Sequence, residues 1–156
     1  VAQKANANLR TMGVALAPCT IPAAGRPHFV LGEDEMELGM GIHGEPGIER
    51  TKMKTADEVT DILTQKILED LPFKAGDEVS VMVNGLGATP LLELLIMFRR
   101  LSQILKESKI DIYRSFVGNY STSLEMAGVS ITVLRLDEEL KRLLDAPAST
   151  PYFSQR

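Results

Sequence analysis

Within residues 55–105, patterns typical of helices and of strands alternate along the chain, and this order indicates a layered fold. Thr55–Glu58 has the pattern of a capping box, and the apolar spacing that follows predicts a helix ending before Pro72. Val79–Val83 has the β-branched density of a buried strand. Thr89 then reads as the N-cap of a second helix that has proline at its first position. This order predicts one sheet layered with helices, in the α/β class or, alternatively, the α+β class.

The remaining segments complete a predicted mixed sheet of about five strands. Apolar residues at helical spacing predict an N-terminal helix, and β-branched runs predict further buried strands. The hydroxyl-rich stretch before the last strand is expected to cap a helical turn, and contact with a partner is the alternative. In order, the predicted segments are a helix over 5–16, a strand pair 28–31 and 35–42, a strand over 110–117, a capping segment 119–124, a strand over 129–136, a short helix from Asp137, and a C-terminal tail 146–156.

Length and composition restrict the function classes. The 156 residues are enough for about one domain with a proper hydrophobic core. The longest apolar run, Leu94–Phe98, is far too short to span a membrane. A net charge of −4 and the lack of tryptophan argue against a nucleic-acid groove. Cys19 is the only cysteine, which excludes an internal disulfide and predicts a reducing, cytoplasmic location.

The beginning of the chain indicates a fragment. It opens at Val1, without methionine and directly before the helix expected over 5–16. We therefore interpret residues 1–16 as a helix entering from a missing N-terminal part of the polypeptide. That part is expected to have been removed by design, by proteolysis or by natural division of the gene product.

The segment Gly39–Ile48 carries the strongest chemical signal. It places His43 in a glycine-rich loop after a predicted strand, and glycines let the backbone approach a ligand closely. If the strand alternation persists, His43 points to the side opposite Ile42 and leaves the core. A turn residue or capping donor is the plain alternative for a lone histidine of this kind.

A second glycine-rich loop joins the buried strand to the following helix. Asn84, Gly85, Gly87 and Thr89 lie where backbone amides and a helix N-terminus meet, which is a site suited to an anion. The third glycine of a dinucleotide fingerprint is missing, and no P-loop follows. A tight strand-to-helix connection is the favoured interpretation, and the loop can also wall a substrate site.

Other polar residues do not form a recognisable site. Nothing near His28 completes a set of zinc ligands, and no metal site is expected. The acidic run 33–37 is interpreted as a solvated strand edge whose carboxylates alternate between two faces. No nucleophile, histidine and acid can be ordered into a hydrolase triad from sequence alone.

Several long motifs resemble one enzyme family. The chain resembles the C-terminal half of the substrate-binding K subunit of dihydroxyacetone kinases in three long motifs. These are GMGIHGEPGIER, the upstream APCTIPAAGRPHFVLGEDEMELG and the downstream VNGLGATPLLEL. Together with the GNYSTSLEM and DAP segments, these motifs cover nearly the whole chain. The resemblance implies the second domain of the two-domain architecture shared with DegV proteins.

The resemblance assigns a definite role to His43. It implies a covalent hemiaminal between this histidine and the ketone carbon of dihydroxyacetone, with Gly41, Gly44 and Glu45 as further residues of the substrate loop. Glu45 is expected to orient the loop or the ring. Glycerol lacks an electrophilic carbon, so the covalent bond itself discriminates against it. Binding is expected to weaken below about pH 6.5, where imidazoles ordinarily gain a proton.

The resemblance also implies partners. The phosphoryl group comes from an ADP-carrying L-type subunit in phosphotransferase-coupled systems, or from ATP on a fused domain, and this chain ends too early for the fused form. ADP or ATP with Mg belongs to that partner, and no cofactor is expected in this chain. General acid and base residues belong to the absent N-terminal domain, so the fragment alone is expected to be inactive. A homodimer is also implied.

Two rival functions remain open at this stage. A paralogous coactivator keeps the same histidine and binds dihydroxyacetone as a signal without catalysing its phosphorylation. A lipid-carrying DegV-type protein shares the architecture but is not expected to keep the GIHGEPG motif.

Overall fold

The computed structural model describes residues 1–27, 29–43 and 45–156. Its main sheet has six strands in the order β5-β4-β1-β8-β6-β7, and two short hairpins lie outside it. In chain order, the elements are α1 Ala2–Ala7, β1 Leu9–Ala17, β2 Thr20–Ile21, β3 Arg26–Pro27, β4 Glu35–Leu38, β5 Glu49–Lys52, α2 Ala56–Asp70, β6 Glu78–Gly85, α3 Leu91–Glu107, β7 Asp111–Gly118, β8 Ala127–Arg135, α4 Glu138–Leu144, β9 Ala148–Ser149 and β10 Ser154–Gln155.

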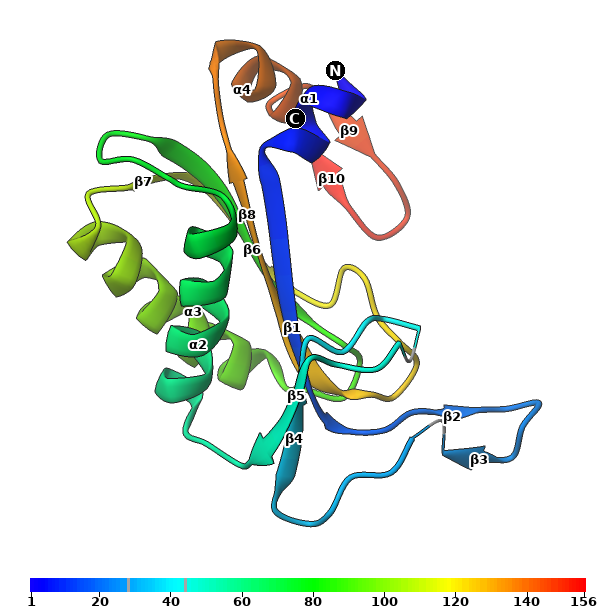
Figure 1. Cartoon of the computed structure of the whole chain (residues 1–156). Helices are drawn as coiled ribbons and strands as arrows, with labels where there is room; N and C mark the ends of the chain where they lie inside the picture. The colour runs from blue at the N-terminus through cyan, green and yellow to red at the C-terminus, as the bar shows by residue number, and fades with distance from the viewer. Residues whose placement is uncertain (28, 44) are drawn as a thin grey trace.

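The sheet is mixed, as the sequence predicted. β6 and β7 run parallel and are joined through α3, whereas the other neighbouring pairs run antiparallel. Helices α2 and α3 cover one face of the sheet, and the glycine-rich loop that follows β4 lies on its other side (Figure 1). One face is therefore packed into the core, while the other is available to the loops that follow β4 and β6.

Strand residues at alternate positions form the core with the two long helices. Val81, Val83 and Ile131 are fully buried on the face that meets Leu63 of α2 and Leu94 of α3. These side chains come from the predicted β-branched runs, whose packing holds the central strands rigid. The loops at the strand ends are therefore attached to rigid strands.

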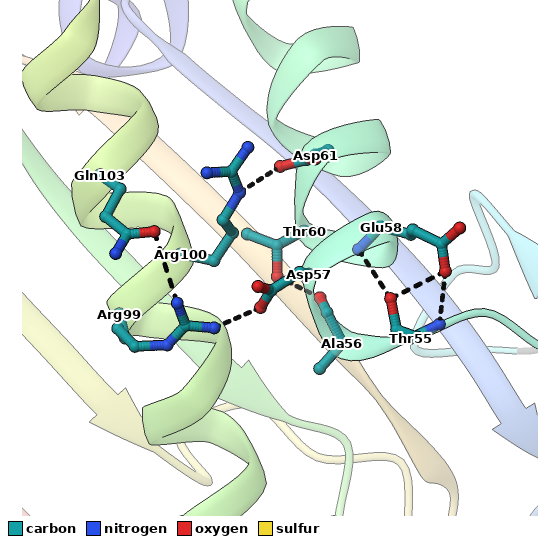
Figure 2. Close-up of polar contacts among 9 residues, drawn as sticks. All are labelled: Thr55, Ala56, Asp57, Glu58, Thr60, Asp61, Arg99, Arg100 and Gln103. Atoms are coloured by element: carbon teal, nitrogen blue, oxygen red, sulfur yellow. Dashed lines mark hydrogen bonds and ion pairs between the residues drawn. The ribbon is translucent and has the colours of Figure 1, made fainter.

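A cap at the start of α2 and ion pairs between α2 and α3 stabilise the surface of the helical layer (Figure 2). The Thr55 hydroxyl accepts from the Glu58 backbone N–H, and the Glu58 carboxylate accepts in return, which confirms the capping box. Arg100 pairs with Asp61 at 2.6 Å between the two helices. None of the helices in the described part of the chain is long and apolar enough to cross a membrane.

The predicted N-terminal helix over 5–16 is wrong beyond its first three residues. Only Ala2–Ala7 is helical, and Leu9–Ala17 forms β1 between β4 and β8. Met12, Val14 and Leu16 alternate onto the core face, so the apolar spacing taken for a helix also contained a strand period. Pairing with two neighbouring strands outweighs the local helical preference, which the glycine at position 13 already weakens.

The strand predicted over 35–42 is confirmed only for its first half, and its predicted pairing with residues 28–31 is not found among the described residues. β4 spans only Glu35–Leu38 and pairs with β1 on one side and with β5 on the other. Residues 29–31 are not in a strand, and His28 lies outside the described residues. The polar β5 segment was not predicted because its residues are mostly exposed and show no apolar alternation.

Two corrections concern the edges of the fold. The strand over 110–117 is confirmed in place as β7, but it is a half-exposed edge strand, because β6 is its only neighbour among the described strands. The segment 146–156 is not a plain tail, since β9 and β10 pair as a hairpin. The helix from Asp137 is confirmed, with the Asp137 carboxylate accepting from the Leu140 backbone N–H at 2.9 Å.

Candidate functional site

The loop that carries His43 begins at Gly39, directly after β4. Gly39 has φ +79°, a conformation that favours glycine, and its backbone N–H donates to the Gly13 carbonyl of β1 at 2.7 Å. A Cβ on Gly13 would lie 3.1 Å from the Met40 carbonyl oxygen. Glycine at position 13 therefore lets the loop lie close against β1. The strand does not persist to Ile42, so strand alternation does not orient His43.

A buried carboxylate holds the other end of the loop. The Glu37 side chain is 9% exposed, and it accepts from the Gly47 N–H at 2.7 Å and from the Arg50 guanidinium at 2.9 Å. Burial acts to raise the pKa of Glu37, but these two donors outweigh burial and hold that pKa below its usual value. The solvated edge predicted for this acidic run is wrong at Glu37, because Gly47 and Arg50 fold back over it.

His43 lies in the turn between these two anchors. Its side chain is 78% exposed, so the ring is free to meet a ligand. Glu45 Oε2 accepts from the His43 backbone N–H at 2.6 Å, and Glu45 Oε1 lies 3.1 Å from His43 Nδ1. Gly41 donates its N–H to the Glu45 carbonyl at 3.4 Å. Gly44 lies outside the described residues.

A pocket of about 380 Å³ opens beside the first half of this loop. Its floor is the uncovered face of β1, β6 and β8, and residues 39–42 form one wall. Hydroxyl and amide groups from the strands line it together with methionines, a mixture suited to a small polar ligand. The lining residues are Thr11, Met12, Gly13, Gly39, Met40, Gly41, Ile42, Met82, Asn84, Leu86, Ser121, Ser130 and Thr132.

Asn84 organises the wall of this pocket. Its amide nitrogen donates to the Ser121 carbonyl at 2.8 Å and to the Ser130 hydroxyl at 3.1 Å. Its amide oxygen accepts from the backbone N–H groups of Tyr120 and Ser121, both at 2.8 Å. The segment 119–124 is therefore held by Asn84, and it does not cap a helical turn as predicted.

The two glycines of the second loop are required by close packing. A Cβ on Gly85 would lie 2.2 Å from the side-chain oxygen of Asn119. Gly87 has φ +136°, and a Cβ there would lie 1.8 Å from the Leu124 carbonyl oxygen. These contacts favour the tight connection over an anion site.

Thr89 is not the N-cap of α3. The cap is Pro90, whereas the buried Thr89 hydroxyl donates to the Gly128 carbonyl at 2.7 Å and accepts from the Gly128 N–H at 3.0 Å. Thr89 lines a different, mostly apolar pocket of about 180 Å³ beside α2 and α3. Among the candidates of the second loop, only Asn84 lines the same pocket as Gly41.

The sequence reasoning missed the hydroxyls of the pocket floor. Thr11 and Thr132 face each other across β1 and β8, with their hydroxyl oxygens 2.9 Å apart. The alternation of Ser130, Ile131 and Thr132 signalled one polar strand face, but the prediction treated this strand only as scaffold. Within residues 1–27, 29–43 and 45–156, no group of three His, Cys, Asp or Glu side chains is placed to hold a metal ion.

Comparison with known proteins identifies the family. The Dak1 domain matches residues 1–152. The chain belongs to the Dak1 domain family. A dihydroxyacetone-binding subunit of a PTS-dependent dihydroxyacetone kinase from Listeria innocua is 52% identical over 152 residues, which cover 97% of this chain and 46% of the relative. An L-erythrulose kinase of Pectobacterium atrosepticum is 43% identical over 157 residues, covering 98% of this chain and 27% of the kinase.

Solved structures support the same fold for this Dak1 domain. A co-activator of a dihydroxyacetone kinase operon matches with a TM-score of 0.86 and 33% identity, over 94% of this chain and 46% of that one. A fatty-acid-binding protein of Thermotoga maritima matches with a TM-score of 0.54 and 11% identity, over 84% of this chain and 44% of that one. At that identity the second likeness shows the fold alone. The chain spans about half the length, or less, of these relatives.

Proposed function

We propose that this Dak1 domain is the histidine-bearing part of a dihydroxyacetone kinase and binds dihydroxyacetone as a hemiaminal on His43. The observation that carries the proposal is the exposed imidazole, held by Glu45 in a loop whose first half walls a polar pocket. A neutral imidazole nitrogen is a competent nucleophile toward a small activated ketone. The covalent bond then fixes the substrate with a terminal hydroxyl free for phosphorylation.

The phosphoryl group in this proposal comes from an ADP-carrying partner subunit of a PTS-dependent system. The Listeria innocua relative is a subunit of such a kinase, which supports the expectation of partner subunits. The proposal places the acid and base residues in a preceding domain and gives none of the described residues that role. A homodimer and a cytoplasmic location stay predictions.

A non-catalytic coactivator is the second candidate. The likeness to the co-activator structure covers nearly the whole chain, which supports a protein that binds dihydroxyacetone as a signal. Erythrulose is an alternative substrate, because one relative is an L-erythrulose kinase and erythrulose also has a ketone carbon for His43 to attack. The lipid-carrying alternative has only a likeness of fold in its favour.

The deciding experiment uses the full-length protein that carries this chain. It is mixed with a phosphorylated donor chain and its ADP-binding partner, and phosphorylation of dihydroxyacetone, erythrulose and glycerol is followed for native protein and for His43→Ala. Turnover of a ketone that is lost in the variant supports the kinase. Ketone binding without turnover supports the coactivator. Absence of both binding and turnover contradicts both functions and leaves His43 as a turn residue.

A further inference from the structure

One carboxylate holds both the backbone and the ring of His43. Glu45 Oε2 accepts from the backbone N–H at 2.6 Å, and Oε1 lies 3.1 Å from Nδ1. The ring projects into solvent, with 78% of its side chain exposed, so no packing against the core fixes its rotation. Among the described residues, the other charged side chain that hydrogen-bonds to this loop is Glu37, which accepts from the Gly47 N–H at its far end and pairs there with Arg50.

The protonation state of Glu45 decides which ring nitrogen carries the proton. Its own backbone N–H, and then the His43 ring, hold the pKa of Glu45 below its ordinary value of 4.5, so the carboxylate is ionised at neutral pH. An ionised carboxylate can only accept hydrogen bonds. Nδ1 is therefore the donor, and in a neutral ring the lone pair is on Nε2.

We infer that Glu45 is the positioning residue of this site, which selects the Nδ1–H form of His43 and presents the Nε2 lone pair to the ketone. The inference rests on the proposed function, because it assigns the orientation of the same nucleophile. Without this contact, the exposed neutral ring exists in both protonated forms, Nδ1–H and Nε2–H, and in many rotations. Only a fraction of the molecules then presents the Nε2 lone pair to the ketone.

The bond-forming step balances without any further reagent except water. The Nε2 lone pair forms the carbon–nitrogen bond, and the π pair of the carbonyl moves to its oxygen, which takes a proton from water. Water is left as hydroxide, and the ring of the adduct is positively charged. The ring keeps its Nδ1 proton, which stays hydrogen-bonded to the Glu45 carboxylate. Glu45 lies beside Nδ1 and stabilises the positive ring.

Gly41 provides the space for the Glu45 carboxylate. A Cβ at position 41 would lie 2.2 Å from Glu45 Oε2, at the end of a flexible side chain that can move away. Gly41 does not have a positive φ, so alanine fits its backbone. Gly41→Ala therefore moves the carboxylate without removing it and without straining the fold.

The test measures adduct formation on the full-length protein with dihydroxyacetone labelled at its ketone carbon. Nuclear magnetic resonance follows the conversion of that carbon from carbonyl to tetrahedral. Glu45→Gln keeps the shape but offers one acceptor oxygen in place of two. We expect Glu45→Gln and Gly41→Ala to weaken the adduct about ten- to hundredfold, the range seen when a metal-binding histidine loses the hydrogen-bond partner of its other ring nitrogen. Glu49→Gln, which changes an exposed carboxylate on β5, is the matched control and should bind as native protein does.

Nitrogen resonances of the His43 ring separate positioning from a merely structural role. Native protein should show Nδ1 protonated in the neutral ring, and both variants should show a mixture of forms. An adduct that weakens while the ring form stays native overturns the inference, and so does an adduct of native strength in both variants. In either case the proposed function stands if His43→Ala abolishes the adduct. If native protein forms no adduct at all, the proposed function itself fails.

Discussion

Arg50 and Glu37 are register partners across β4 and β5, and the guanidinium donates to the carboxylate at 2.9 Å. The same carboxylate accepts from the Gly47 backbone N–H, so one side chain ties the second half of the His43 loop to the sheet. Glu37 is nearly buried, and water screens this arrangement less than it would screen a surface ion pair. The structural support of the loop is therefore electrostatic at this end.

The first prediction is that Glu37→Gln destabilises the fold and loosens the loop. An uncharged amide loses the ion pair with Arg50 but still accepts from Gly47. We expect a loss of about 1.5–3 kcal/mol in the free energy of unfolding, typical of hydrogen bonds to a charged group. Urea unfolding measures it, with Glu33→Gln in an exposed turn as the control. Equal unfolding midpoints for both variants would show that the ion pair contributes nothing.

The second prediction concerns the pH dependence of this contribution. The pKa of Glu37 lies below its ordinary value of 4.5 in the folded protein, so the folded state favours the ionised form. Its contribution is fully present above pH 4.5 and is lost as pH falls through the folded pKa. The stability difference between native protein and Glu37→Gln should therefore shrink on acidification below that value. Urea titrations at a series of pH values measure it, and a difference that is constant down to acid unfolding contradicts the assignment.

The third prediction is that Asn84 is the most sensitive polar residue of the pocket wall. Asn84→Ala removes an acceptor from two backbone N–H groups and a donor from Ser121 and Ser130. We expect a loss of about 3 kcal/mol, since buried groups left without partners each cost about 1–3 kcal/mol. Thermal unfolding measures the loss.

Ser130→Ala is the matched comparison for Asn84→Ala. It removes one acceptor of the Asn84 amide and leaves the two backbone N–H groups bonded. We expect a smaller loss of about 1 kcal/mol. If Ser130→Ala costs as much as Asn84→Ala, the Asn84 network is not the reason for the sensitivity.

The sequence was sufficient where a single local pattern decides the structure. The capping box at Thr55 needs only neighbouring residues, and it is confirmed. The N-terminal strand shows the opposite case, because Met12 and Leu16 fit a helical period and a strand period alike. Its pairing with β8, a strand more than a hundred residues later, decides the outcome, and no local pattern contains that information.

The same contrast between local patterns and long-range contacts applies to the residues of the candidate site. His43 stood out through its glycine loop and through the resemblance, and the structure leaves its ring exposed. The role of Glu37 in holding Gly47 and Arg50 was missed, because the acidic run has the composition of a solvated edge. Glu37 is buried only because β5 returns beside β4. Asn84 was correctly singled out, but its role is to hold the 119–124 segment. Thr89 is turned to the other face of the sheet by its bonds to Gly128.

The last prediction compares two glycines that share a positive φ but differ in their surroundings. Gly87 has φ +136°, and a Cβ there would meet a backbone carbonyl at 1.8 Å, whereas Gly76 has φ +90° and no atom within 4 Å of the same position. Gly76→Ala should cost about 1–2 kcal/mol from conformational strain alone. Gly87→Ala adds a backbone clash that no rotamer can relieve, and a loss above about 4 kcal/mol is expected. Urea unfolding of the two variants side by side measures the difference. Similar losses would mean that the β6–α3 connection yields to the added methyl group, and the glycine would then be needed for its φ alone.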